Sequence, residues 1–120
     1  MTVTRFKRAD LEEAVGDDPT LLASLIDLFL EVQPKRMQEL EAQLSRGDAF
    51  EAAKTAHTLV GSFRSMAMPG PGGLAKAVEN ACRDGQLEMA RDGFRALRPE
   101  YDALVAELKV VRVTLPMPAA

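Results

Sequence analysis

The 120-residue sequence has no tryptophan and a single tyrosine, and aromatic residues make up only 5% of it. A chain this poor in aromatics offers few rings on which the bases of a single-stranded nucleic acid can stack. Its net charge of −3 also works against binding to nucleic acid, because affinity for the phosphate backbone comes largely from lysine and arginine. We therefore expect no nucleic-acid partner.

Cysteine and histidine occur once each, as Cys82 and His57. One cysteine cannot close an internal disulfide, so a cytoplasmic, reducing location is expected. One histidine and one cysteine at separate positions do not supply the three or four convergent ligands of a metal site, and we expect none. Cys82 falls on the inward side of its predicted helix, where small cysteines commonly pack, which speaks against a Cys82–His57 nucleophilic pair.

Long apolar runs are missing as well. Charged residues follow within a few positions of the first methionine, so no signal peptide is predicted. The longest apolar-rich stretch, residues 21–30, is interrupted by Ser24 and Asp27 and falls far short of the roughly 20 residues that cross a bilayer. The composition, 47% hydrophobic and 28% charged, is typical of one globular domain, and we expect no membrane association.

What the sequence does have is helical periodicity along most of its length. A short first helix is predicted at residues 10–16, between a capping Asp10 and Gly16. The pair Asp18-Pro19 starts a long amphipathic helix that ends near Gly47. Because proline removes a helical hydrogen bond, we expect a kink or break in this helix at Pro34.

The second half of the chain predicts three further helices. The first opens at Asp48 and stops before residues 68–73, a stretch with two prolines and three glycines that we expect to form a loop. The others cover residues 74–84 and 87–111; the last has apolar residues at alternating steps of three and four, and Pro99 is expected to bend or break it. That spacing suits antiparallel packing in a left-handed bundle. We predict an all-α single domain over residues 1–120, with its core at about 10–111 and a frayed tail at 112–120.

Imidazole is the only ordinary side chain that titrates near neutral pH, with a pKa of about 6.5, so His57 is the natural candidate for chemistry. On its predicted helix, Lys54 and Gly61 lie one turn away and Arg64 two turns away. A glycine inside a helix costs about 1 kcal/mol relative to alanine, so Gly61 needs a reason. One reason is an open flank beside the imidazole for a phosphoryl group or a partner, with Lys54 and Arg64 supplying positive charge.

A second interpretation of the same residues needs no chemistry. In it His57 is a half-buried residue at the edge of the core, and Gly61 merely lets another helix approach closely. Spacing alone favours this interpretation slightly, because a lone histidine on a helix is usually not catalytic.

The residues around His57 resemble those of histidine-containing phosphotransfer (Hpt) domains. That family has an Ala-His-x-Leu-Lys-Gly-Ser core, which residues 56–62 match except at Val60. Residues 29–31, Phe-Leu-Glu, match the preceding helix of the family, and Gly47-Asp48 match its turn. The resemblance covers roughly residues 10–108 and implies an antiparallel four-helix bundle, here with a short extra N-terminal helix.

Two departures from the family pattern stand out. Val60 replaces the usual lysine beside the phosphohistidine, and Ala67 with the proline- and glycine-rich stretch replaces a short turn. From helical spacing, Arg64 or Lys54 is a candidate to replace the missing lysine. In the family a polar residue on the next helix often supports the histidine, and the sequence does not decide between Glu79, Asn80 and Cys82 for that role.

The resemblance implies a phosphorelay intermediate rather than a self-contained enzyme. His57 would accept a phosphoryl group on Nε2 from a receiver-domain aspartate and pass it to another receiver, with response-regulator receiver domains and a hybrid histidine kinase as partners. The Mg²⁺ would come from the receiver, no cofactor would be bound by this chain, and the protein would be a monomer. Gly61 would leave room for the phosphoryl group, and docking would involve Thr58, Val60, Gly61 and Arg64.

Two alternatives remain open at this point. Val60 leaves room for an Hpt-like binding module that docks on a receiver or histidine kinase without carrying phosphate. The regular apolar spacing between Leu87 and Val111 is also compatible with a plain helical scaffold or oligomerisation domain.

Overall fold

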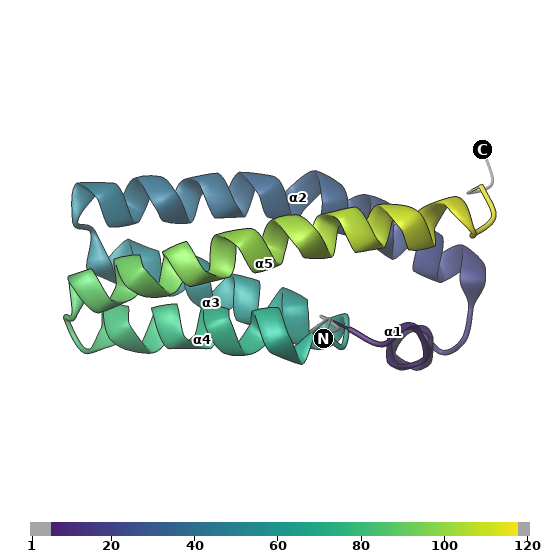
Figure 1. Cartoon of the computed structure of the whole chain (residues 1–120), viewed down its shortest axis with the longest axis horizontal. Coiled ribbons are helices and arrows are strands. Elements are labelled where there is room, and N and C mark those ends of the chain that lie inside the picture. The colour runs from purple at the N-terminus through teal and green to yellow at the C-terminus, as the bar shows by residue number, and fades with distance from the viewer. Residues whose placement is uncertain (1–5, 118–120) are drawn as a thin grey trace.

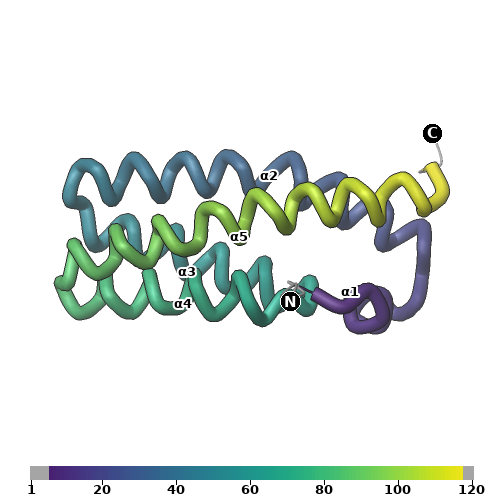
Figure 2. Tube along the Cα trace, in the orientation of Figure 1, coloured from purple at the N-terminus to yellow at the C-terminus, as the bar shows by residue number. Residues whose placement is uncertain are grey.

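The computed structural model describes residues 6–117, and over these residues the chain forms five helices and no strand. Helices α2 to α5 run up and down beside one another as an antiparallel four-helix bundle, while α1 lies across one end, as Figures 1 and 2 show. The predicted fold class is therefore confirmed, including the short extra helix. The helices span α1 (Arg8–Ala14), α2 (Pro19–Arg46), α3 (Ala49–Ser65), α4 (Pro69–Arg83) and α5 (Leu87–Val113).

The ends of α2 and the start of α3 lie where the capping residues predict them. Asp18 Oδ1 accepts hydrogen bonds from the backbone N–H groups of Thr20 and Leu21, at 3.0 and 3.1 Å. Gly47 ends α2 with a φ of +76°, a left-handed conformation that glycine adopts without a Cβ penalty. Asp48 then accepts from the N–H of Glu51 at 3.1 Å and starts α3.

The core lies along the middle of the bundle, where the apolar stripes of α2, α3, α4 and α5 face one another. Phe63 of α3 is fully buried, and its ring lies 6.1 Å from the ring of Phe29 on α2 and 6.5 Å from that of Tyr101 on α5. These are ordinary distances for tilted and edge-on aromatic pairs. Three helices are thus joined around one side chain of the helix that carries His57.

Helices α2 and α5 are also fastened near both ends of their contact. Toward the start of α2, Arg112 forms a two-pronged ion pair with Asp27, at 2.8 and 3.2 Å. At the end of α2, Arg91 donates from Nε and Nη2 to the carbonyl of Leu44, at 3.0 and 2.9 Å. This carbonyl belongs to the last turn of α2, where carbonyl groups have no partner within the helix.

The loop predicted at residues 68–73 is wrong, because α4 already begins at Pro69. Pro69 and Pro71 are the first and third residues of the helix, where the backbone N–H would have no helical partner, so their missing donors cost nothing there. The first helical bond observed runs from the N–H of Gly72 to the carbonyl of Met68, at 3.0 Å. Gly72 also lies against α3, where a Cβ would come within 3.6 Å of Phe63 Cβ.

A kink or break is expected at Pro34 and a bend or break at Pro99; neither helix breaks, since α2 and α5 each run through their proline without interruption. Both prolines lie on the exposed side of their helices. The tail is also more ordered than predicted: α5 continues to Val113, and Leu115 packs against the core. Residues 118–120 of the predicted tail lie outside the described residues. None of the described helices has a stretch long and apolar enough to cross a membrane.

Candidate functional site

His57 lies in the middle of α3 with 67% of its side chain exposed. Among residues 6–117, one hydrogen-bond partner holds its ring: Nδ1 is 3.0 Å from Oε2 of Glu79, on the neighbouring helix α4. Because Nδ1 faces Glu79, Nε2 lies on the opposite edge of the ring. The imidazole is therefore fixed in orientation by one nitrogen and accessible at the other.

Glu79 is a buried carboxylate, with only 2% of its side chain exposed. Two cations from its own helix bind it. Arg83 donates to Oε2 from Nη2 at 2.8 Å and from Nε at 2.9 Å, and Lys76 donates to Oε1 from Nζ at 3.2 Å. His57, Lys76 and Arg83 therefore meet at one carboxylate.

Burial alone would raise the pKa of Glu79, but hydrogen bonds from Arg83, Lys76 and His57 outweigh burial and hold this pKa below its ordinary value. Glu79 is thus ionised at neutral pH and can only accept hydrogen bonds. Its bond to His57 requires the proton of a neutral imidazole to be on Nδ1. The lone pair of the neutral ring is then on Nε2, the nitrogen that faces away from Glu79.

Two cations, Lys54 and Arg64, are expected near His57 from helical spacing alone. In the structure they lie in opposite directions along α3. Lys54 turns toward the start of α3, with Nζ 3.4 Å from Glu51 Oε1 and 4.5 Å from the centre of the Phe50 ring. Arg64 is exposed two turns beyond His57. Neither is among the residues bonded to the His57–Glu79 pair, whose cations come from α4.

Of the residues predicted for docking, Thr58, Gly61 and Arg64 are exposed on α3. The hydroxyl of Thr58 donates to the carbonyl of Lys54 at 3.2 Å. Val60 is different: only 3% of it is exposed, because it points into the core between α3 and its neighbours. Its expected place on a docking surface is therefore wrong.

Gly61 has open space around it, since a Cβ added there would meet no other atom within 4 Å. Close approach of another helix consequently does not explain this glycine. The idea that His57 is half-buried also fails, because most of its side chain is exposed. Both parts of the interpretation without chemistry are wrong, and an open flank beside His57 remains.

Of the three candidates to support His57, namely Glu79, Asn80 and Cys82, the one that contacts it is Glu79, and two signals in the sequence favour this residue. On a helix it shares a face with Ala75 and Cys82, small residues that favour an inward side, where a lone carboxylate would be costly. Lys76 and Arg83 lie three residues before it and four after it, the spacings at which oppositely charged side chains pair on a helix. A buried acidic position flanked in this way predicts an ion-pair cluster facing α3.

The comparisons with known proteins agree with this geometry. The family model described as Hpt domain matches residues 24–107, well over half of the sequence. The chain belongs to the Hpt domain family. It therefore has a phosphotransfer role in two-component signalling, in which Hpt domains interact with receiver domains and kinases.

A solved structure gives the same fold for this Hpt domain. It is the histidine-containing phosphotransfer protein B (HptB) from Pseudomonas aeruginosa PAO1, with a TM-score of 0.83 and 24% sequence identity. The match covers 96% of this chain and 100% of that one. At this identity the likeness supports the fold alone. None of the curated proteins matches the sequence.

Two other groups in the Hpt domain were candidates for chemistry. Burial raises the pKa of the Cys82 thiol, so this side chain stays protonated at neutral pH, as expected for a packing residue. Residues 6–117 contain no group of three or more histidine, cysteine, aspartate or glutamate side chains arranged to hold a metal ion. Neither feature adds a second centre to the site at His57.

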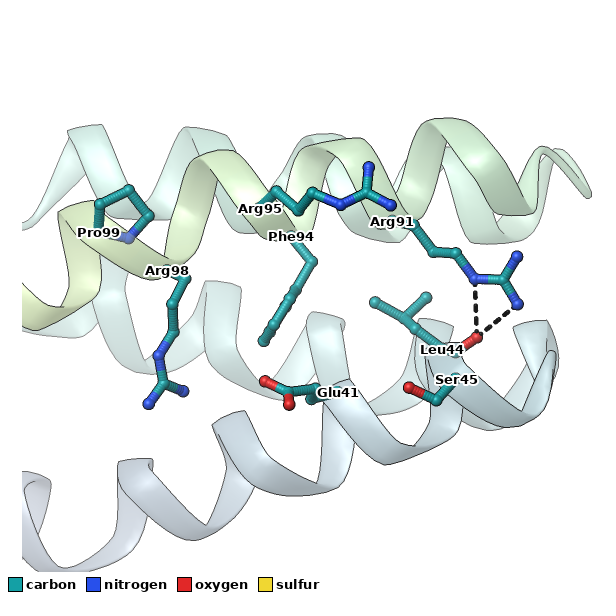
Figure 3. A pocket seen from close by; sticks show the side chains of 8 residues that line it. All are labelled: Glu41, Leu44, Ser45, Arg91, Phe94, Arg95, Arg98 and Pro99. Atoms are coloured by element: carbon teal, nitrogen blue, oxygen red, sulfur yellow. Dashed lines mark hydrogen bonds between the residues drawn. The ribbon is translucent and has the colours of Figure 1, made fainter.

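A cavity of about 450 Å³ lies on another side of the Hpt domain, between α2 and α5 (Figure 3). Each of its three arginines has an acidic partner on its own helix, and Arg91 also binds the carbonyl of Leu44. We therefore interpret the cavity as the surface of the contact between α2 and α5, which Arg91 holds together. Its lining residues are Glu41, Leu44, Ser45, Arg91, Phe94, Arg95, Arg98 and Pro99.

Proposed function

We propose that His57 is the residue that carries the phosphoryl group, accepting it from a receiver-domain aspartate and passing it to a second receiver. The observation that carries this proposal is the hydrogen bond of 3.0 Å between His57 Nδ1 and buried Glu79, made by an imidazole that is 67% exposed. A nucleophile needs one accessible nitrogen with a free lone pair. The bond to Glu79 leaves that lone pair on Nε2.

In the transfer, the Nε2 lone pair attacks phosphorus in line with the bond to the aspartyl oxygen. An N–P bond forms, the O–P bond breaks, and the receiver recovers its aspartate carboxylate. The ring keeps its Nδ1 proton and becomes positively charged, and the ionised carboxylate of Glu79 stabilises that charge. We propose that the Mg²⁺ that balances the charge on the phosphoryl oxygens belongs to the receiver.

The receiver would dock over the exposed face that includes His57. Thr58, Gly61 and Arg64 supply its α3 side. A groove of about 390 Å³ continues from Ser62 and Ser65 to the apolar side chains of α2, including Leu28, which is exposed. A partner surface with apolar side chains that enter the groove and a polar rim around them fits this face.

The experiment is phosphoryl transfer from a panel of receiver domains, each phosphorylated on its aspartate. We expect wild-type protein to take up label that is labile to acid and stable to alkali, the behaviour of phosphohistidine, and His57→Gln to take up none. Failure of every receiver to label the wild type would support instead a module that docks without carrying phosphate, provided that it still binds a receiver.

Gly61 offers a prediction about the open flank. Gly61→Leu is expected to raise the free energy of unfolding by up to about 1 kcal/mol, because leucine is a far better helix former and the space is empty. The same side chain should lower transfer from a receiver by roughly tenfold, since it occupies the approach to His57. Urea unfolding and transfer kinetics measure the two effects.

The matched control is Ala106→Leu, which adds an exposed leucine to α5. It should leave the transfer rate unchanged. If Gly61→Leu transfers as fast as this control, then the open flank has no part in receiver docking.

A further inference from the structure

Lys76 lies across the helix contact from Val60, the position where the family usually has a lysine. Two contacts fix the antiparallel register of α3 and α4: His57 meets Glu79, and a Cβ on Gly72 would lie 3.8 Å from Cγ of Arg64. In an antiparallel pair, three residues back along α4 correspond to three residues forward along α3. Lys76, three before Glu79, therefore lies opposite Val60, three after His57.

We propose that Lys76 supplies the cation that Val60 cannot, so that the stabilising lysine of the site stands on α4 instead of α3. This inference rests on the proposed role of His57 as phosphoryl carrier. When the phosphoryl group is on Nε2, the ammonium group of Lys76 turns from Glu79 to the phosphoryl oxygens. It lowers the barrier to transfer by stabilising their charge.

The charges at Glu79 favour this arrangement. One carboxylate is bound by two cations, Lys76 and Arg83, so the cluster carries an excess of one positive charge before any phosphoryl group arrives. A phosphoryl group adds negative charge beside it. The excess positive charge therefore lies beside His57, and its sign is opposite to that of the phosphoryl group.

Lys76 is better placed to move than Arg83. Arg83 holds Oε2 through two nitrogens, whereas Lys76 makes a single bond of 3.2 Å to Oε1. Its side chain is 39% exposed and flexible, so it can leave Glu79 at the cost of one bond. Arg83 would remain on Glu79 and keep the carboxylate paired and aimed at His57.

The test uses phosphoramidate, a small phosphoryl donor, so that the result does not depend on the identity of the receiver. We expect Lys76→Met to slow phosphorylation of His57 by roughly tenfold, the effect of losing one charge-assisted contact, while Lys76→Arg keeps most of the rate. Lys109→Met, an exposed lysine on α5, is the control and should match the wild type. Circular dichroism checks that each variant is folded.

Rescue separates a direct role from a structural one. Adding Val60→Lys to Lys76→Met should restore most of the rate, because a long side chain at position 60 can carry its ammonium group out to solvent beside His57. Equal labelling of wild type and Lys76→Met would overturn this inference and leave the role of His57 intact. A folded double variant that stays as slow as Lys76→Met would also overturn it. A wild-type protein that takes no label would overturn both.

Discussion

Glu79→Gln is expected to slow phosphoryl transfer to His57 by roughly ten- to a hundredfold, the range found when a group that orients a metal-binding histidine is removed. Glutamine has one carbonyl oxygen where Glu79 offers two carboxylate oxygens. It cannot accept from His57, Lys76 and Arg83 in the observed arrangement, and it has no charge with which to stabilise the imidazolium. The Nδ1–H bond that presents Nε2 is thereby weakened.

The measurement is the initial rate of labelling, with phosphoramidate and with a phosphorylated receiver. Glu88→Gln is the control, because it removes a glutamate that is ion-paired but lies on α5 and is exposed. It should leave both rates unchanged. A Glu79→Gln protein that is folded and labels at the wild-type rate would contradict the role of Glu79.

The same substitution has a consequence for stability. Because the pKa of Glu79 is lowered in the folded protein, its ionised form stabilises the fold at pH values above the ordinary glutamate pKa. This contribution is lost as the pH falls through the lowered pKa. The difference in unfolding free energy between wild type and Glu79→Gln should therefore be largest near neutral pH and shrink in acid.

Phe63→Ala is expected to lower the free energy of unfolding by about 3–5 kcal/mol. The side chain is fully buried, and its loss removes the ring contacts with Phe29 and Tyr101 that join α2, α3 and α5. Urea unfolding followed by circular dichroism gives the value by linear extrapolation.

Phe50→Ala provides the comparison, because Phe50 lies on the same helix but is 71% exposed. Its loss should cost less than about 1 kcal/mol, including its contact with Lys54. Similar losses for the two variants would mean that Phe63 does not hold the bundle together as described.

The fold could be predicted from sequence largely because local signals agree with tertiary packing. The residues of α2 and α5 that are buried are largely the apolar ones at helical spacing. The side chain of Asp18 caps the start of α2, and the left-handed backbone of Gly47 ends this helix. The segment 69–73 could not be predicted in the same way. Its prolines and glycines are poor helix formers, yet they occupy a first turn that needs no donors and packs against Phe63.

At the site, sequence identified the helix face and His57 but not the residues that act on it from α4. Helical spacing relates only residues of one helix, so it offered Lys54 and Arg64 as cations. Glu79 contacts His57, and brings its own partner Lys76 to the site, through the register of α3 against α4, which depends on where the turn between the two helices begins. The sequence does not place this turn correctly, because it predicts a loop at residues 68–73, where α4 has already begun.

The role of His57 is tested most directly by finding which atom carries the phosphoryl group, by NMR of the ¹⁵N-labelled protein after reaction with phosphoramidate. We predict a phosphoryl group on Nε2 of His57, with the proton kept on Nδ1 beside Glu79. A phosphoryl group on Nδ1, or on any residue other than His57, would contradict this prediction.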